Sequence, residues 1–312
     1  MPALPQPDYE SVPLFQKYLP YADQKMQRAA LDMFLPAFHE RFDVHLKSPR
    51  NDYEARIEKG DEILGRLQQD GYSLSKIPEG LKAQLIAQTA GAVAELEARI
   101  QGQDQVSIKG SQALLTPQSH PGVRETLHSI FKAQSLYDVL GAYCRRPVRM
   151  TEHATVQVNL AKHSAAQYGP IDQDGLPANK AQYFHIDSAM WPWIKVLIYL
   201  SPVTADQGPF RFVPGSHRWC NDYELVVRKT NDKLGIAPKY FVALPEEFRM
   251  NTHFGDYLTP DTPGVDRLMR DERVLIDGES DFVLFDNNGV HRGGFVREGR
   301  RHIMQVFVRA KE

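Results

Sequence analysis

The sequence predicts a mainly β protein with added helices, arranged as an antiparallel sandwich or jelly roll. Beyond residue 147 it contains many short strand-like runs, separated by turn signals such as Gly208-Pro209 and Pro214-Gly215. No helical periodicity falls between most of these runs, which favours antiparallel pairing over βαβ units. Neither a GxGxxG pattern after a strand nor a Walker A pattern occurs, so nucleotide binding of those types is not indicated.

Helical spacing of apolar residues dominates the first 110 residues, which are therefore expected to form a mostly helical N-terminal part. Helices are expected near 22–46, over 52–69 and over 77–100, and the second should stop at Gly71. A further helix is expected over 121–143.

The β part begins where the periodicity changes from helical to alternating. Residues 147–160 alternate from Thr155 onward, as a half-buried strand does. The other expected strands are 181–187, 194–200, 210–213, 281–285 and 302–309. A jelly-roll core over 147–309 follows, within a single domain over 1–312.

Residues 219–277 interrupt this core with a polar, charged and proline-containing segment. An insertion of this length between core strands is typical of a functional lid or a disordered segment. Together with residues 163–182, it is expected to shape the substrate entrance and close over it.

The composition excludes several classes of partner. The chain has 312 residues with 37 basic and 39 acidic side chains, a net charge of -2, which does not favour nucleic-acid binding. No run of about 18 apolar residues is present, so no membrane-spanning helix is expected, and residues 1–7 do not resemble a signal peptide. Its two cysteines, Cys144 and Cys220, could form a disulfide, but so few fit a reducing cytoplasm better. A small-molecule partner is expected, and the oligomeric state is left open.

The run Tyr183-Phe184-His185-Ile186-Asp187 is the sharpest short feature. On a strand, His185 and Asp187 face the same side because residues i and i+2 do so. A second histidine from elsewhere would complete a two-histidine, one-carboxylate metal site with open positions, as in non-haem Fe(II) oxygenases. Taken alone, the HxD pattern is also compatible with an ordinary histidine at the end of a strand and a surface aspartate.

Two later segments supply context for this motif. Residues 208–217 read Gly-Pro-Phe-Arg-Phe-Val-Pro-Gly-Ser-His, where His217 is expected to be structural. Residues 281–291 form a strand-like run that passes through a turn into His291, and Arg301 opens the last strand ten residues later.

With these pieces in this order, the sequence resembles the phytanoyl-CoA dioxygenase family of Fe(II)- and 2-oxoglutarate-dependent oxygenases, over roughly residues 60–310. The resemblance implies a double-stranded β-helix (cupin-like) core flanked by N-terminal helices. It also implies Fe(II), 2-oxoglutarate and O2 as cofactor and cosubstrates.

The resemblance assigns roles residue by residue. His185, Asp187 and His291 correspond to the iron ligands and hence to the catalytic centre. Arg301 corresponds to the arginine that binds the far carboxylate of 2-oxoglutarate, a task that suits a bidentate guanidinium. Arg300 is the alternative, because neighbouring strand residues face opposite sides, and Arg297 is less favoured.

Two further positions are candidates for the cosubstrate pocket. Asn159 resembles a pocket-lining position of the family, although it could equally be an ordinary polar strand residue. Trp191 lies where some relatives place an aromatic side chain beside the cosubstrate, although packing or a place in the substrate wall is an alternative.

One departure from the family pattern concerns the residues after His291. Many relatives have Gly-Ser there, and the hydroxyl helps to hold 2-oxoglutarate, whereas this chain has Arg292-Gly293-Gly294. Asp187 is retained, which disfavours halogenation.

The expected activity is therefore hydroxylation of a C–H bond of a small or medium-sized organic substrate, with release of succinate and CO2. Two alternatives stay open. One is a catalytically silent cupin-like protein that binds a metal or ligand, and the other is a cupin enzyme that does not use 2-oxoglutarate.

Overall fold

The computed structural model describes residues 60–104, 106, 109–161, 184–185, 194–218, 265–276, 282–287 and 289–311. All of them belong to one compact unit, formed by Pro49–Arg218 and Tyr257–Glu312. The helix expected near 22–46 and most of the 219–277 insertion lie outside the described residues.

The first described helix ends, and the second begins, close to the residues that the sequence predicts. Helix α3 (Asp61–Asp70) stops at Gly71, whose φ of 83° places it in the left-handed region that favours glycine at the end of a helix. Helix α4 (Glu79–Gln101) starts after Pro78, in line with the expectation over 77–100.

The helix expected over 121–143 is instead two helices. Helix α5 (Pro121–Ala133) ends before Gln134, and α6 (Leu136–Cys144) begins after Ser135. Ser135 has a φ of 52°, a left-handed conformation that a continuous right-handed helix excludes. The apolar periodicity continues across this break because both helices bury residues on the sheet side, so periodicity alone did not reveal it.

A seven-stranded sheet, the major sheet, forms the centre of the unit. Its strand order is β1-β8-β5-β10-β4-β2, and β3 also pairs with β10. Every pairing in it is antiparallel. The strands are β1 (Tyr72–Ser75), β2 (Gln112–Leu115), β3 (Val148–Met150), β4 (Ala154–Leu160), β5 (Ile194–Tyr199), β8 (Phe282–Asp286) and β10 (Arg300–Ala310).

Strands β5, β8 and β10 confirm the expected strands to within about two residues, and the β segment expected over 147–160 forms two strands, β3 and β4. Strand β1, by contrast, comes from the part of the chain expected to be helical, and β2 follows that part directly, before the helix expected over 121–143; they are the two outermost strands of the sheet. Each has only four residues, too few to establish an alternating pattern within a mainly helical segment.

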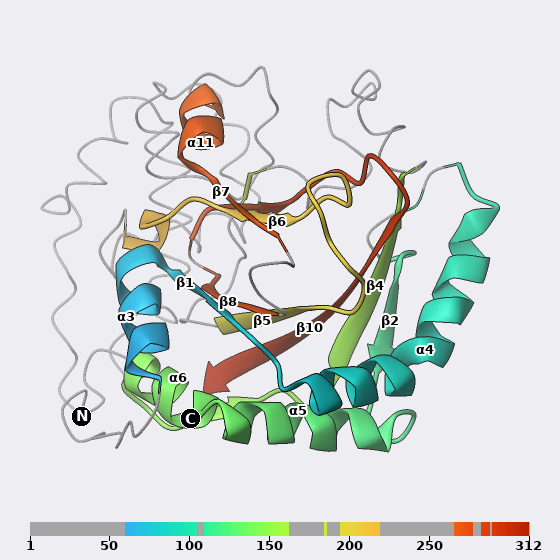
Figure 1. The fold of residues 1–312 in the computed structure, drawn as a ribbon. Helices are drawn as coiled ribbons and strands as arrows, with labels where there is room; N and C mark the ends of the chain where they lie inside the picture. Colours follow the sequence, from blue (N-terminus) through green and yellow to red (C-terminus); the bar gives the residue numbers. More distant parts are fainter. Residues whose placement is uncertain are drawn as a thin grey trace, which may run out of the picture. The chain divides into compact units, whose positions relative to one another are not determined.

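A second, three-stranded sheet, the minor sheet, has the order β7-β6-β9 and is also antiparallel. It comprises β6 (Phe210–Phe212), β7 (Arg273–Leu275) and β9 (His291–Gly293). A short 3₁₀ helix, η4 (Ser216–Arg218), follows β6, and α11 (Val265–Asp271) precedes β7. Helices α4, α5 and α6 lie along one side of the major sheet, and β6 and β7 lie on the other (Figure 1).

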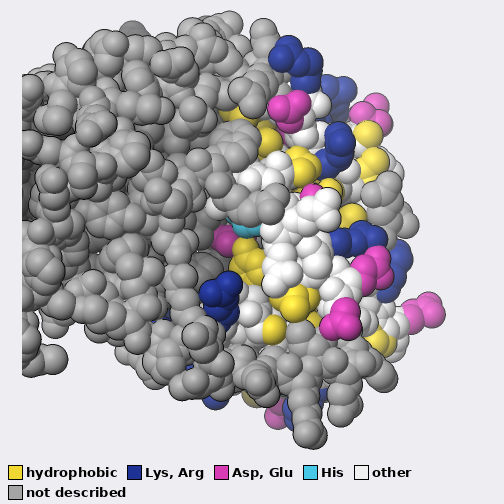
Figure 2. Space-filling model, turned by 90° about the vertical axis from the view of Figure 1, so that its left-hand side faces the viewer, with side chains coloured by type: hydrophobic (Ala, Val, Ile, Leu, Met, Phe, Trp, Pro, Cys, Tyr) yellow, Lys and Arg dark blue, Asp and Glu magenta, His cyan; other side chains and the backbone are white. Residues whose placement is uncertain are grey.

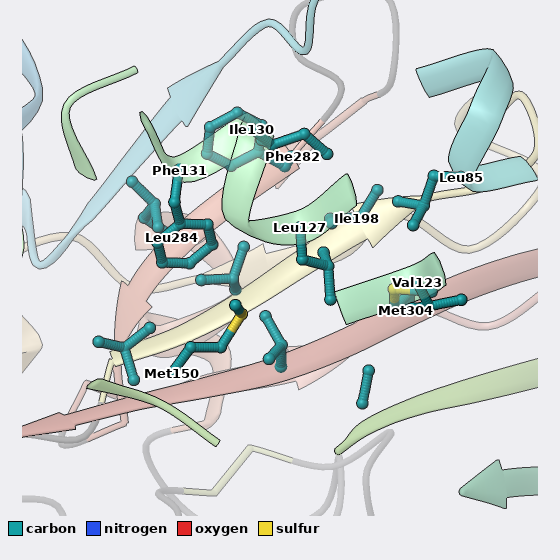
Figure 3. Packing of buried hydrophobic residues seen from close by; sticks show 14 of the residues in the cluster. Leu85, Val123, Leu127, Ile130, Phe131, Met150, Ile198, Phe282, Leu284 and Met304 are labelled. Carbon is teal, nitrogen blue, oxygen red and sulfur yellow. The ribbon is translucent and has the colours of Figure 1, made fainter. Parts of the chain in front are cut away.

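The helix side of the major sheet is packed with hydrocarbon. Val123, Leu127, Ile130 and Phe131 of α5 are buried and belong to one cluster with strand residues. The strand residues of this cluster include Met150, Ile198, Phe282, Leu284 and Met304, several of which surround α5 in the close view of Figure 3. This continuous apolar layer supplies most of the hydrophobic stabilisation of the described unit.

The opposite side of the major sheet faces the minor sheet through a second, smaller apolar cluster. Leu197, Tyr199, Val283, Phe285 and Ile303 of the major sheet meet three residues of the minor sheet, which are Phe210, Phe212 and Leu275. Along β5, Val196 and Ile198 belong to the helix-side cluster, whereas Leu197 and Tyr199 belong to the inter-sheet cluster. This alternation is the period-two pattern of a strand that is buried on both faces.

The outer surface carries charges of both signs. On the face drawn in Figure 2, Lys and Arg side chains of the described part are interspersed with Asp and Glu side chains. No helix among the described residues is long and apolar enough to cross a membrane. Cys144 is buried, and burial together with the charge of Asp286 raises the pKa of its thiol to about 12, so this thiol is not reactive at neutral pH.

Candidate active site

Two of the three expected metal ligands lie side by side. His185 and His291 form an isolated antiparallel bridge, in which each backbone N–H donates to the carbonyl oxygen of the other residue, at 3.0 and 2.9 Å. Directly opposed residues in an antiparallel pair project from the same face. The two imidazole rings accordingly lie with their centroids 4.4 Å apart.

The ring of His291 is held in one orientation by its surroundings. The residue is 2% exposed, and Nδ1 lies 2.8 Å from the carbonyl oxygen of Gly289. A carbonyl oxygen only accepts, so Nδ1 carries the hydrogen and the neutral ring presents the lone pair of Nε2. Phe212, directly opposite on β6, lies nearly parallel to the ring, with 11° between the planes. A histidine whose other ring nitrogen donates to a carbonyl is the arrangement typical of a metal ligand.

The Pro-Gly-Ser-His segment positions His291 through hydrogen bonds to the preceding residue, Val290. The backbone N–H of Val213 donates to the carbonyl oxygen of Val290 at 2.9 Å. The hydroxyl of Ser216 accepts from the N–H of Val290 at 2.7 Å and donates to the carbonyl oxygen of Val213 at 2.6 Å. Nε2 of His217 lies 3.3 Å from the carbonyl oxygen of Gln68 at the end of α3, away from the histidine pair. The motif therefore anchors the residue before His291, and the contact of His217 with α3 is consistent with the structural role expected for it.

The third expected ligand, Asp187, lies outside the described residues, as does Trp191. Within the described ranges, no group of three or more His, Cys, Asp or Glu side chains is close enough together to hold a metal ion. The described geometry thus places two imidazoles on one face.

Arg301 points into the interior, whereas Arg300 points out of it. Arg301 is 4% exposed. Arg300 has a side chain that is 60% exposed and pairs with Glu97 at 2.9 Å. Arg297 is exposed as well. Of the three arginines considered from the sequence, only Arg301 faces the histidines' side of the sheet.

Asn159 lies directly opposite Arg301 in the register of β4 and β10. Nη2 of Arg301 donates to Oδ1 of Asn159 at 3.0 Å. Nη1 donates to the carbonyl oxygens of Gly208 and of Gly294, the latter at 3.3 Å. These neutral acceptors fix the guanidinium in place without neutralising its charge.

The electrostatics of Arg301 are unusual for a buried residue. No carboxylate pairs with it among the described residues, and its buried Nε has no hydrogen-bond partner there. Burial lowers the pKa of the guanidinium to about 10, an effect that the nearby Tyr199 partly opposes. The group still carries its charge at neutral pH. An uncompensated buried charge is costly, and an anionic ligand would offset that cost.

One cavity brings these groups together. It is lined by Gln157, His185, Lys195, Leu197, Tyr199, Phe210, Phe285, His291, Gly293, Arg301, Ile303 and Gln305. The lining thus combines two imidazoles, the cationic side chains of Arg301 and Lys195, and the amides of Gln157 and Gln305 with aromatic and aliphatic side chains. Such a mixture of an apolar wall and a few convergent polar groups is typical of a ligand site.

Sequence reasoning missed several groups at this site. Gln305 donates to Gln157 at 3.1 Å, and both lie on the cavity side of their strands. Gln157 lies two residues before Asn159, and Gln305 lies four residues after Arg301. Because even spacings on a strand share a face, this spacing is the signal that could have found them. Arg292 and Glu272 are paired on the other side of β9, and no spacing in the sequence indicates that contact.

The two facing antiparallel sheets, with a histidine pair and a buried arginine between them, define a jelly-roll protein with a candidate metal and anion site. A family model described as "Phytanoyl-CoA dioxygenase (PhyH)" matches residues 67–299, three quarters of the chain. The chain therefore belongs to the phytanoyl-CoA dioxygenase family. This family comprises Fe(II)- and 2-oxoglutarate-dependent oxygenases, so Fe(II), 2-oxoglutarate and O2 are its cofactor and cosubstrates.

Solved structures of EctD show the same fold at low sequence identity. EctD from S. alaskensis with 2-oxoglutarate and 5-hydroxyectoine matches with a TM-score of 0.51 and 13% identity, over 84% of this chain and 81% of that one. EctD with bound Fe matches with a TM-score of 0.50 and 14% identity, over 84% and 82%. The carbocyclase SnoK from nogalamycin biosynthesis matches with a TM-score of 0.49 and 15% identity, over 82% and 85%. No curated protein sequence matches the chain.

Proposed function

We propose that this protein is a dioxygenase that hydroxylates a C–H bond of a small or medium-sized organic substrate, using Fe(II) and 2-oxoglutarate and releasing succinate and CO2. One observation carries the proposal. The buried guanidinium of Arg301, without a carboxylate partner among the described residues, lines the same cavity as the paired imidazoles of His185 and His291. A metal-binding face and a positive charge in one cavity suit a cosubstrate that chelates a metal through one end and carries a carboxylate at the other.

His185, Asp187 and His291 would hold the iron. Two imidazole nitrogens and one carboxylate oxygen occupy one face of a metal and leave the other positions open to ligands. The contact from Nδ1 of His291 to the carbonyl oxygen of Gly289 supports this role, because it directs Nε2 toward a ligand. Asp187 enters the proposal from the HxD spacing, which puts its side chain on the same face as His185.

Arg301 would bind the far carboxylate of 2-oxoglutarate, and Asn159 would hold the guanidinium in the correct plane. Two parallel N–H groups of a guanidinium match a carboxylate, and such pairs are the strongest hydrogen bonds in proteins. Trp191 is proposed to line the same pocket. The pocket of this chain lacks a hydroxyl after His291, so the guanidinium carries a larger share of cosubstrate binding.

The remaining residues of the cavity control its environment. When bound, iron and 2-oxoglutarate supply the oxidising power, so that one oxygen atom of O2 enters the substrate and the other enters succinate. Leu197, Phe210, Phe285 and Ile303 surround this position with hydrocarbon. A dry wall strengthens the charge interactions of Arg301 and limits side reactions with water.

Anaerobic titration with visible absorption tests the cosubstrate site. Apoprotein would receive Fe(II) and then 2-oxoglutarate, and we expect the weak charge-transfer band that chelated 2-oxoglutarate gives with Fe(II). Arg301→Met should weaken 2-oxoglutarate binding by about 30-fold or more, because removing one partner of a buried charge pair costs about 2–5 kcal/mol. Arg300→Met is the matched control and should bind 2-oxoglutarate normally, since its side chain points away from the cavity.

The competing cupin functions give different results. A band that survives in His291→Ala, or succinate formation that survives in Asp187→Ala, would refute the proposed iron ligands. Iron binding without any 2-oxoglutarate band would instead favour a cupin protein that does not use this cosubstrate.

A further inference from the structure

The bridge between His185 and His291 has a second face, which carries a different set of side chains. Neighbouring residues on a strand project to opposite sides, so Phe184 and Arg292 lie on the face opposite the two imidazoles. The register that pairs His185 with His291 places Phe184 directly opposite Arg292. The guanidinium carbon of Arg292 lies 4.3 Å from the centroid of the Phe184 ring. The segments that carry the two histidines are therefore joined on both faces.

A buried carboxylate fixes Arg292 in this position. Nε and Nη2 of Arg292 donate to Oε2 and Oε1 of Glu272 at 2.9 and 2.7 Å. The side chain of Glu272 is 4% exposed and that of Arg292 is 12% exposed. A bidentate pair of this kind restricts the plane of the guanidinium, and here that plane faces the Phe184 ring.

Glu272 also removes a conflict within the minor sheet. Arg211 of β6 lies directly opposite Arg292 of β9, and like charges in that position repel. Nη1 of Arg211 donates to the same Oε1 of Glu272 that accepts from Arg292. One carboxylate therefore holds together two cations on adjacent strands, and it reaches them from the residue just before β7.

We propose that Glu272 and Arg292 are positioning residues for the paired histidines. Their ion pair, together with the contact of Arg292 on Phe184, sets the backbone spacing of the His185–His291 bridge from its outer face. This inference rests on the proposed function, since it assumes that the two imidazoles bind the metal. It also gives a role to Arg292, the residue that departs from the Gly-Ser pattern of many relatives.

Metal binding by the apoprotein tests this role without any turnover. Co(II) is the probe, because its visible spectrum reports the number and geometry of its ligands. Removing a group that orients a metal ligand commonly weakens metal affinity by about 10–100-fold. We expect that loss in Glu272→Gln, with a changed Co(II) spectrum, and an intermediate loss in Arg292→Lys, which keeps the charge but not the planar, bidentate contact.

The chain offers a matched control in Glu97. This carboxylate also accepts from Arg300 and His302, at 2.9 and 2.8 Å, but it does so on the helix side of β10, the face opposite the cavity. Glu97→Gln should leave Co(II) affinity and the Co(II) spectrum unchanged. Circular dichroism and urea unfolding of each apoprotein would establish that the variants compared are folded, and Arg292→Lys serves if Glu272→Gln does not fold.

The outcomes separate this inference from the proposed function. Co(II) binding by the wild-type protein that depends on His185, with wild-type affinity and spectrum in both Glu272→Gln and Arg292→Lys, would overturn the positioning role alone. Absence of Co(II) binding in the wild-type protein would overturn the proposed metal site and this inference with it. A loss in Glu97→Gln as large as in Glu272→Gln would also contradict the positioning role, because it would show a general effect of removing a carboxylate.

Discussion

The two faces of the major sheet are built from the same strands but differ in chemistry. On β10, Met304, Val306 and Val308 face the helices and are fully buried in hydrocarbon, while Arg301 and Gln305 line the cavity on the other face. The charged side chains on the helix face of β10 are paired, since Glu97 of α4 binds Arg300 and His302, whereas the cavity face contains a buried cation without a carboxylate partner in the described part. In a strand that is buried on both sides, the residues of one face can thus stabilise the fold while the residues of the other face bind a ligand.

Replacing Phe131 by Ala should disrupt the packing on the helix face and cause the largest loss in the free energy of unfolding. Phe131 is 0% exposed on α5, in contact with the ring of Tyr137 at a centroid distance of 5.1 Å. Loss of a buried phenylalanine side chain costs about 3–5 kcal/mol, through lost burial and the cavity it leaves. Urea unfolding monitored by circular dichroism would measure the change in the free energy of unfolding.

The same variant also tests whether the two faces are separate. At a temperature where Phe131→Ala is still folded, its affinity for Co(II) should equal that of the wild-type protein. A large loss of metal affinity in the folded variant would show that packing on the helix face sets the histidine geometry, contrary to the division between the faces.

This division explains which parts of the fold could be predicted from sequence. The long buried strands β4, β5, β8 and β10 carry strong apolar patterns, and their positions follow from those patterns. The four-residue strands β1 and β2 do not, because their pairing partners are distant in sequence and supply the signal. The break at Ser135 does not show in the sequence, because both helices bury residues on their sheet side and the apolar periodicity continues across it.

The candidate site divides in a similar way. Strand parity predicted that only one of Arg300 and Arg301 could face inward, and the register with Asn159 shows which one does. The roles of His185, Asp187, His291, Arg301, Asn159 and Trp191 in binding remain predictions. The pairing of Glu272 with Arg292 depends on how β6, β7 and β9 align, and a single sequence does not encode that alignment in any local spacing.

A methyl group added at Gly289 should disturb the packing around His291 on the cavity face. A Cβ there would lie 2.0 Å from Cζ of Phe212, a fully buried ring that stacks on His291, so the ring or the turn must move. Such overpacking costs about 1–3 kcal/mol. Because the carbonyl of Gly289 also accepts from Nδ1 of His291, we expect Gly289→Ala to weaken Co(II) affinity by about tenfold or more.

Urea unfolding and Co(II) titration of the apoprotein would measure the two effects of Gly289→Ala separately. Lower stability with unchanged metal affinity would mean that the turn before His291 packs the protein without orienting the ring. That result would contradict the assignment of the Gly289 carbonyl as the group that fixes the imidazole.

The same substitution at Gly91 should have the smallest effect and the opposite sign. Gly91 lies within α4 on its exposed side, and a Cβ built there meets nothing within 4 Å. Alanine is favoured over glycine inside a helix by about 0.5–1 kcal/mol, since glycine loses more backbone freedom on folding. Gly91→Ala should therefore raise the free energy of unfolding by about that amount and leave Co(II) affinity unchanged. Destabilisation by Gly91→Ala would show that α4 makes a close contact on its outer side, and the outer surface of the helix layer would then have to be counted as part of the packed structure.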